Sequence, residues 1–342
     1  MINELVNTDL IDEAYAWLCK QRKHFPENSD VWHCRFHWNT IKPQLIDDLT
    51  SNQFNFQPLQ KITKSNGGVI HLWTSIDSLV LKLLSLVLQR YLPSSKLCTH
   101  PKGHGGSKQT VTSIQAELPN NTFVFRTDVK SYYESINHEI LLEKLAVYIK
   151  DKIVLNLLAQ YLKRSVESGG LFTDITKGIS SGCPLSPIIS SFYLVELDEK
   201  MESKNVYYRR YMDDIIVLSP SRWKLRKAIK TVNQHFEQLK LEQHPDKTTI
   251  GRITHGFDFL GYQFGQEKIT VSKRTLENHI RRITQLYEQK KHLPNWQMLL
   301  DDYRRRWVTW VYAGIPSSIL VAGLALPLLP CFNAAGRNNH QA

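Results

Sequence analysis

The chain has 342 residues, of which 42% are hydrophobic, and this size and composition are those of a globular protein with two or three packed units, which excludes a disordered chain. Lys and Arg number 43 against 32 Asp and Glu, so the formal net charge is +11 at pH 7, which favours a polyanionic partner such as nucleic acid or an anionic membrane surface. The five cysteines are scattered and never form a C-x-x-C pair, which argues against a disulfide framework or a zinc ribbon and fits a reducing cytosol.

The first 50 residues are predicted to form an N-terminal helical extension. Leu10, Ala14, Trp17 and Leu18 recur there at helical spacing. The segment carries acidic residues early and lacks the basic start and apolar core of a secretory signal. A cytoplasmic location is therefore expected.

A β-hairpin is predicted over residues 59–73, because two short apolar runs flank S-N-G-G, which is the composition of a hairpin turn. This hairpin carries Lys61 and Lys64. Residues 76–92 are apolar nearly all round, which is typical of a helix buried on most faces. The glycine-rich stretch 99–110 lacks the context and lysine spacing of a nucleotide-binding P-loop and is predicted to be a flexible loop.

The stretch TFVFRTDVKSYYESI begins as a β-rich run and ends in polar turn residues, so Asp128 is expected where a strand ends. A helix is predicted to follow, with Asn137 as its N-cap. Downstream, residues 177–187 form a Gly/Ser/Pro loop that precedes an amphipathic helix over 188–201.

Two adjacent carboxylates, Asp213 and Asp214, lie in the stretch VYYRRYMDDIIVLSP, where simple packing would favour no charge. Strands are predicted on either side, over 206–211 and 215–218. Met212 and Asp213 are therefore expected at the tip of a β-hairpin.

The C-terminal third is predicted to continue with a helix over 223–240 and then short strands broken at Gly256, Gly261 and Gly265. A further helix is predicted beyond them, with an apolar face and a basic face. The apolar face comprises Leu276, Ile280, Ile283 and Tyr287, and Arg281 lies opposite.

No charged residue occurs from Trp307 to Gly336, a length that suffices to cross a bilayer. Pro316, Pro327 and Pro330 would break such a helix repeatedly. A membrane span is therefore not expected.

Three carboxylates thus fall at edges of predicted sheet: Asp128, Asp213 and Asp214. Like charges brought within a few Å either raise one pKa strongly or are neutralised by a cation, and Mg²⁺ prefers carboxylate, water and phosphate oxygens. Taken alone, an Asp-Asp pair is more often a solvated turn. The other motifs of the chain favour the metal site.

The ordered set TDVKSYY, GISSGCPLSP, YRRYMDD, HPDKTTIGR and GFDFLGYQF resembles the palm of reverse transcriptases, in particular the bacterial lineage related to group II intron enzymes. The resemblance runs from about Leu59 to Gly314. It ends without room for the maturase-type DNA-binding module or the endonuclease of intron-encoded relatives, so a free-standing polymerase is expected.

The resemblance implies an α+β fold, a right-hand polymerase with fingers, an antiparallel-sheet palm and a helical thumb. It divides the chain into the extension 1–50, fingers 51–122, palm 123–270 with a helical insertion at 137–180, thumb 271–314, and an apolar tail 315–342 of unassigned role.

The resemblance also implies the site. It gives Asp128, Asp213 and Asp214, with the carbonyl of Val129, as ligands of two Mg²⁺ ions, with Mn²⁺ able to substitute. Lys247 resembles the lysine that protonates departing pyrophosphate, or is a surface lysine that faces phosphate. The residues expected to bind the nucleotide are Val129, Tyr133, Ser181, Gly182, Lys61 and Lys64. Others are expected to contact primer or template: Pro184, Ser186, Leu260, Gly261 and Arg281.

Two departures from the family pattern concern the nucleotide. Ser181 stands where related enzymes usually have glutamine, and G-G-V-I-H-L-W lacks the usual fingers arginine. Lys61 and Lys64 are then the expected triphosphate contacts, and nucleotide affinity or fidelity is expected to differ.

The implied activity is RNA-directed DNA polymerisation, with an RNA template, a DNA or RNA primer and dNTPs as partners and a cognate non-coding RNA as a further candidate. No motif selects among retroelement, phage defence, DNA repair and CRISPR-linked roles. An RNA-directed RNA polymerase is the rival enzyme, against which Tyr133 argues as a gate against the 2′-hydroxyl. The third alternative is a non-catalytic RNA-binding protein on a polymerase scaffold.

Overall fold

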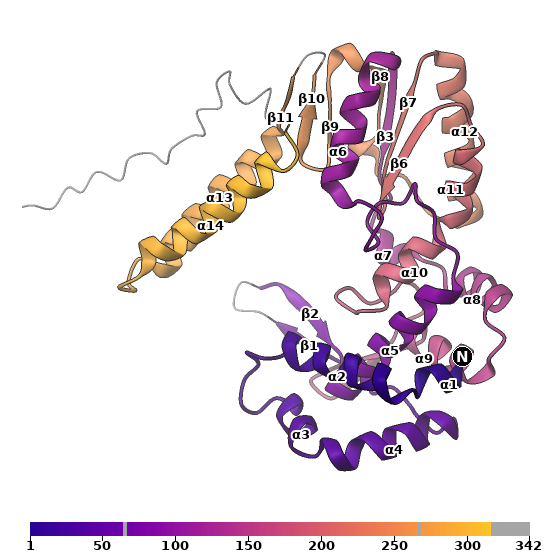
Figure 1. Ribbon diagram of the computed structural model, residues 1–342, viewed down its shortest axis with the longest axis vertical. Helices are drawn as coiled ribbons and strands as arrows, with labels where there is room; N and C mark the ends of the chain where they lie inside the picture. Colours follow the sequence, from indigo (N-terminus) through magenta and orange to yellow (C-terminus); the bar gives the residue numbers. More distant parts are fainter. Residues whose placement is uncertain (64–66, 266–267, 316–342) are drawn as a thin grey trace, which may run out of the picture. The chain divides into compact units, whose positions relative to one another are not determined.

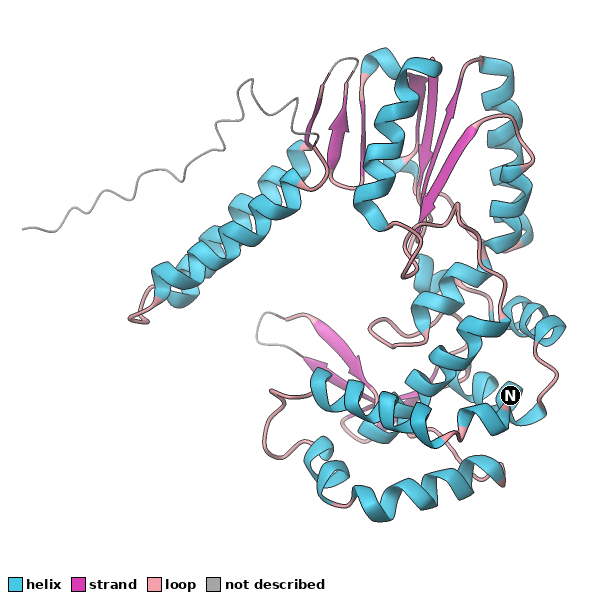
Figure 2. Cartoon of the chain, in the orientation of Figure 1, coloured by secondary structure: helices cyan, strands magenta, loops and turns pink. Residues whose placement is uncertain are grey.

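The computed structural model describes residues 1–63, 67–265 and 268–315 (Figure 1). The chain divides into two compact units, one formed by Met1–Thr110 with Glu117–Ile253, the other by Val111–Ala116 with the chain from Thr254. Figure 2 shows that both units combine helices with strands. Lys64 and residues 316–342 of the predicted tail lie outside the described residues.

The predicted N-terminal helices form and belong to the core of the first unit. They are α1 (Ile2–Leu5), α2 (Thr8–Gln21), α3 (Asp30–Phe36) and α4 (Trp38–Thr50). Helix α2 packs against α5 (Ser75–Tyr91), whose apolar residues are buried on most sides, as the sequence predicts. Arg22, just after α2, is buried and donates hydrogen bonds to the Trp73 carbonyl at 2.6 Å and the Ser78 hydroxyl at 2.8 Å. These contacts fasten the N-terminal segment to the start of α5.

A four-stranded sheet lies beside these helices in the order β2-β1-β4-β5. Its strands are β1 (Leu59–Thr63), β2 (Val69–Leu72), β4 (Ser165–Ser168) and β5 (Leu171–Asp174). The first hairpin is the predicted one. The second was not expected, because residues 137–180 were assigned to helices; only α8 (His138–Tyr148) and α9 (Lys152–Leu162) are helical there. Gly169 and Gly170, both with positive φ, turn the chain between β4 and β5.

The palm sheet is antiparallel throughout, in the order β6-β7-β3-β8. It comprises β3 (Phe123–Thr127), β6 (Tyr207–Tyr211), β7 (Asp214–Ser219) and β8 (Thr249–Arg252). Figure 1 shows α11 (Val195–Glu202) and α12 (Arg222–Gln238) running along this sheet. Phe125 and Val217 share a buried cluster with Leu225 and Val232 of α12. The mixed α+β architecture with an antiparallel palm is confirmed.

Three further helices lie before residue 194. They are α6 (Gly106–Glu117), α7 (Tyr132–Ser135) and α10 (Ser186–Tyr193). The loop predicted over 99–110 is therefore wrong at its end, because helix α6 starts at Gly106. The helix predicted at 188–201 instead begins at Ser186 and is divided at Leu194 into α10 and α11. Asn137 caps α8 as predicted, since its side chain accepts from the N–H of Ile140 at 3.0 Å.

The second unit contains the short sheet β9 (Phe257–Phe259), β10 (Tyr262–Phe264) and β11 (Ile269–Val271), and the helices α13 (Lys273–Lys290) and α14 (Trp296–Tyr312). The predicted face of α13 needs a correction. Ile283 is buried, but Ile280 is 50% exposed. His279 lies inward instead, because its ring stacks on Trp307 at 3.8 Å between centroids.

None of the helices in the described ranges is long and apolar enough to cross a membrane.

Candidate active site

The Asp-Asp pair lies at the tip of the β6–β7 hairpin, as the sequence predicts. Tyr211 and Asp214 are opposite each other in the ladder, so Met212 and Asp213 alone form the turn. Met212 has φ +56°, a conformation that non-glycine residues rarely adopt. The tight turn holds Asp213 at the end of the sheet, directly beside Asp214.

Asp128 comes to the same end of the sheet from β3, the strand that pairs with β7. After β3, the chain continues beside residues 242–244: the His244 N–H donates to the Asp128 carbonyl at 3.0 Å, and the Lys130 N–H to the Glu242 carbonyl at 2.9 Å. This pairing brings the following short turn, Pro245–Lys247, next to Asp128. Lys247 Nζ forms an ion pair with Asp128 Oδ2.

The electrostatics of the turn show that these carboxylates are crowded. Burial, with the charges of Asp213 and Asp128 adding to it, raises the pKa of Asp214 to about 6. Burial and the charge of Asp128 also raise the pKa of Asp213, although Lys247 and Arg210 act in the opposite direction. A site of this kind gains from any cation that neutralises the repulsion.

The donor set fits a hard divalent cation. Asp128 Oδ1 is buried and has no hydrogen-bond partner in the described part of the chain, and a buried carboxylate oxygen without a partner is costly. Carboxylate and carbonyl oxygens are the ligands that Mg²⁺ prefers. Within residues 1–63, 67–265 and 268–315, however, no three His, Cys, Asp or Glu side chains already stand at metal-binding geometry. Asp128 Oδ2 is paired with Lys247. To bind an ion through this oxygen, the Asp128 carboxylate must either contact the ion and Lys247 together or rotate away from Lys247.

Both main-chain polar groups of Met212 are held by side chains that the sequence analysis did not select. His100 Nδ1 accepts from the Met212 N–H at 3.2 Å, and Arg210 Nη1 donates to the Met212 carbonyl at 2.8 Å. Burial lowers the pKa of His100 to about 4, so its ring is neutral at pH 7. With Nδ1 as acceptor, Nε2 carries the proton and faces the Pro187 carbonyl at 3.2 Å. We call His100 and Arg210 the Met212 clamp.

Arg210 is fully buried and is paired with Asp198, which is also fully buried. Its Nε donates to Asp198 Oδ1 at 2.8 Å and its Nη2 donates to Oδ2. The Tyr208 hydroxyl adds a third hydrogen bond to the same carboxylate at 2.7 Å. Burial opposes the charge on Arg210, but Asp198 outweighs it and raises the pKa of Arg210 well above its ordinary value. Strand β6, helix α11 and the turn are thereby joined by one ionic network.

The two tyrosines after Asp128 lie in different surroundings. Tyr132 is buried and donates to the Ser190 carbonyl at 2.6 Å. Tyr133 is half-buried. Its carbonyl accepts from the Ile179 N–H at 2.7 Å, which ties this segment to the 177–187 loop. Of the pair, Tyr133 is the one whose ring is partly accessible.

The 177–187 loop is anchored at both ends and exposed in the middle. A Cβ at Gly178 would lie 2.8 Å from the Tyr133 carbonyl, so only glycine allows this close approach. The Ser186 hydroxyl is buried between the Ser180 carbonyl and the Tyr161 hydroxyl. Ser186 is thus committed to shaping the loop, and Pro184 is half-buried, whereas Ser181 and Gly182 are exposed.

In the sheet β2-β1-β4-β5, Lys61 pairs across the strands with His71 and is exposed. Burial, followed by the charges of Arg164 and Lys61, lowers the pKa of His71. Arg164, which the sequence analysis missed, donates to the Gly178 carbonyl at 3.0 Å. It places a cation beside the 177–187 loop.

Leu260, Gly261 and Arg281 belong to the second unit. Leu260 and Gly261 form the two-residue turn between β9 and β10, with φ +48° and +87°. A Cβ at Gly261 would lie 2.8 Å from the Trp310 ring, which explains the glycine. Arg281 is exposed on α13.

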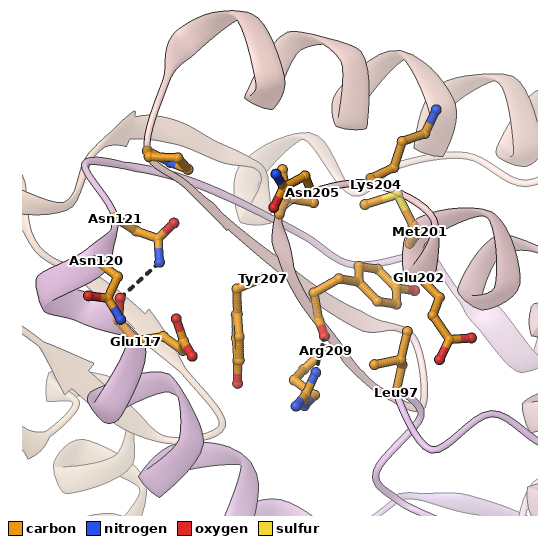
Figure 3. A pocket seen from close by; sticks show the side chains of 13 residues that line it. Leu97, Glu117, Asn120, Asn121, Met201, Glu202, Lys204, Asn205, Tyr207 and Arg209 are labelled. Atoms are coloured by element: carbon orange, nitrogen blue, oxygen red, sulfur yellow. Dashed lines mark hydrogen bonds between the residues drawn. The ribbon is translucent and has the colours of Figure 1, made fainter.

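A pocket of about 420 Å³ opens beside edge strand β6 (Figure 3). Tyr207 and Arg209 line it together with Glu117 and Glu202. The Arg209 guanidinium lies 4.8 Å from the Tyr207 ring centre and donates to the Tyr208 carbonyl at 2.7 Å. None of the sequence-predicted site residues lines this pocket.

Comparison with known proteins agrees with the resemblance drawn from the motifs. The family described as reverse transcriptase (RNA-dependent DNA polymerase) matches residues 39–264. That region contains all three aspartates, both members of the Met212 clamp and Lys247.

Individual relatives are distant. An uncharacterized 91 kDa protein in the cob intron of Schizosaccharomyces pombe is 29% identical over 47% of this chain and 21% of its own length. The group II intron-encoded protein LtrA of Lactococcus lactis subsp. cremoris is 23% identical over 58% of this chain and 34% of its own. Protein YkfC of Escherichia coli K12 is 23% identical over 72% of this chain and 75% of its own. The matched part therefore spans between 21% and 34% of the length of these two intron proteins.

Proposed function

Because the chain belongs to the reverse transcriptase family, we propose that it is an RNA-directed DNA polymerase that extends a primer 3′-hydroxyl with dNTPs on an RNA template. The observation that carries this proposal is the meeting of Asp128, Asp213 and Asp214 at one end of the palm sheet, on strands brought together by the β3–β7 pairing. The direct test is extension of a DNA primer on an RNA template by the purified protein.

Asp128, Asp213 and the Val129 carbonyl would hold two Mg²⁺ ions, with Asp214 in support and Mn²⁺ able to substitute. Bound ions of this kind neutralise phosphate charge and activate the attacking hydroxyl. Lys247 forms an ion pair with Asp128, and its ammonium would donate a proton to the departing pyrophosphate of a triphosphate bound there. Lys61, Lys64 and the Ser181–Gly182 segment bind the nucleotide, and Leu260, Gly261 and Arg281 contact primer and template.

Tyr133 is predicted to exclude ribonucleotides. A half-buried ring on the segment tied to the 177–187 loop collides with a 2′-hydroxyl, whereas the Tyr132 ring is buried and bonded to Ser190. Tyr133→Ala is expected to raise the use of rNTPs relative to dNTPs by at least about tenfold, the effect of roughly 1.4 kcal/mol. Single-nucleotide extension on one RNA template, with dNTP and rNTP in parallel, measures the ratio.

Tyr133→Phe is the matched control, because it keeps the ring and should keep the discrimination. If wild-type protein uses both sugars equally, or if Tyr133→Ala leaves the ratio unchanged, the chain lacks this gate and an RNA-directed RNA polymerase becomes the better reading.

Ser181 is predicted to limit nucleotide affinity. Its side chain is exposed beside Gly182, where the backbone has φ +78° and open space around it. A glutamine reaches further toward a nucleotide, so Ser181→Gln is expected to lower the dNTP KM by a factor of about 3 to 10, the worth of one hydrogen bond. Ser181→Ala serves as the control of similar size. Unchanged KM and unchanged fidelity in Ser181→Gln would remove this loop from the nucleotide site.

A further inference from the structure

Helix α12 carries an unusual concentration of positive charge. No acidic residue occurs from Ile215 to Phe236. Within that interval, five cations fall in nine residues at the start of α12. They are Arg222, Lys224, Arg226, Lys227 and Lys230.

The helix presents most of these charges on the side away from the palm sheet. Leu225, Ala228 and Val232 are buried against the sheet. The residues that recur at i, i+3, i+4 and i+7 on the other side are exposed: Trp223, Arg226, Lys227 and Lys230, with Arg222 beside them. We call these five residues the α12 surface.

None of the cations of the α12 surface forms an ion pair with a residue that the structure describes. Helices α13 and α14 of the same chain differ, because most of their exposed cations lie three or four residues from an acid. Lys291 pairs with Glu288 at 2.5 Å and Arg305 with Asp302 at 2.8 Å. The absence of interleaved acids therefore distinguishes the cationic stretch of α12 from these two helices.

Helix stability does not account for this pattern. Cations near a helix N-terminus oppose the helix dipole, and α12 has no acid in its first turn. Like charges at i, i+4, such as Arg222 with Arg226 and Arg226 with Lys230, repel each other. A polyanion bound along the surface removes both disadvantages.

Aromatic rings lie among the cations. Trp223 is 63% exposed, and Lys227 Nζ lies 3.4 Å from its ring centre. Arg222 and Arg252 both lie over the ring of Phe123, at 5.6 and 5.9 Å. Exposed indole between cations is the combination that stacks an unpaired base while neighbouring groups bind its phosphates. Duplex nucleic acid offers no free base face to such a ring.

The α12 surface is separate from the catalytic turn. Successive residues of a strand point to opposite faces of a sheet. Phe125, Val217 and Tyr208 are cross-strand neighbours on one face, and the Tyr208 hydroxyl bonds Asp198 of α11, the helix that packs against α12. Asp214 has the opposite parity to Val217 in β7, so its side chain belongs to the other face.

We infer that the α12 surface binds single-stranded RNA at a second site, distinct from the place where template and primer are extended. The choice of RNA over another polyanion rests on the proposed function, in which an RNA is the template. The surface holds an unpaired stretch of that RNA through phosphate contacts of Arg226, Lys227 and Lys230 and through base stacking on Trp223.

The test uses full-length protein whose catalytic site is filled by a short, fully paired RNA–DNA duplex in excess. Binding of a fluorescent single-stranded RNA of about 12 nucleotides is then titrated at several salt concentrations. The triple variant Arg226→Gln/Lys227→Gln/Lys230→Gln is compared with a control of equal charge loss on exposed lysines elsewhere in the same unit, Lys23→Gln/Lys150→Gln/Lys152→Gln. Trp223→Ala is tested separately. Because all of these side chains are exposed, unfolding midpoints should match the wild type.

The α12 triple variant should bind the RNA at least about tenfold more weakly, and the slope of log affinity against log salt should fall by about 2. Trp223→Ala should weaken binding about tenfold at unchanged salt slope. The RNA affinity of the control triple should stay within about twofold of wild type. The rate at which the α12 variants extend a short primer should also stay within about twofold of wild type. Equal RNA binding by the α12 triple variant and the control triple overturns the inference. The inference is also overturned if the α12 triple variant loses binding to phosphatidylglycerol vesicles but still binds RNA like the wild type. Absence of extension by wild-type protein is a separate result, which overturns the proposed polymerase activity instead.

Discussion

Asp213→Asn is expected to abolish primer extension while leaving RNA binding nearly intact. The amide keeps the shape of the side chain in the Met212-Asp213 turn but removes the charge on which cation binding depends. Loss of a single preorganised electrostatic group costs about 10²–10³ in rate, and loss of the carboxylate that we propose as a ligand of both ions should cost at least the upper figure. Single-turnover extension at saturating template–primer and Mg²⁺ measures the rate.

A matched control is available in the adjacent turn. Asp246 is exposed and immediately precedes Lys247, so Asp246→Asn makes the same chemical change outside the carboxylate cluster and should extend at close to the wild-type rate. Extension by Asp213→Asn at the wild-type rate would remove this residue from the catalytic set. Weak RNA binding in the same variant would instead indicate a disturbed fold.

Arg210→Met should be the most destabilising single substitution in the palm and should also slow extension. It leaves Asp198 as an unpaired charge in a fully buried position, which costs about 3–5 kcal/mol. It also removes the donor that holds the Met212 carbonyl. Urea unfolding measures the loss of stability. Separate determination of kcat and KM for primer extension measures the effect on the reaction.

The two effects can be separated. In Arg210→Met/Asp198→Asn the buried charge is gone and the amide oxygen still accepts from Tyr208, so most of the lost stability should return. Extension should stay slow, because the Met212 carbonyl still lacks its donor. His100→Leu leaves the Arg210–Asp198 ion pair intact and should lower kcat while the affinity for template–primer stays unchanged. His100→Asn keeps an acceptor for the Met212 N–H, so its kcat should be much closer to the wild-type value. Full extension by the double variant would reduce the Met212 clamp to a packing role.

The sequence predicted those features that depend on local pattern. The fingers hairpin, the buried helix α5, the strand that ends before Asp128 and the two-residue turn at Met212 and Asp213 all follow from short-range turn chemistry and residue spacing. The second fingers hairpin was missed because its strand β5 is exposed along its whole length, so it lacks the alternation that marks a half-buried strand. Gly169-Gly170 was the signal that could have identified it.

The residues that hold the Met212-Asp213 turn could not be found from spacing alone. His100 lies 112 positions before Met212, and only the fold brings them together. Arg210 did leave a signal. Arg210 lies two residues after Tyr208 in β6, so both side chains are on the face of the strand that packs against α11. A cation in such a core position requires a buried acidic partner. The face of α13 was misassigned because stacking on Tyr303 and Trp307 holds His279 in the half-buried position that an apolar count gives to Ile280.

The parallel pairing of β1 with β4 imposes an order on events while the chain is being synthesised. Leu59 is made 107 positions before its partner Val166, a delay of about 5–20 s at usual rates of translation. Until then β1 presents an unpaired edge, with Ile62 and Ile70 on the face of its hairpin, and such edges recruit strands of other chains. Nascent chains on neighbouring ribosomes are therefore most vulnerable to mutual aggregation before Ser165 is synthesised. A ribosomal pause or a premature stop at that stage would leave β1 without β4, its partner in the sheet.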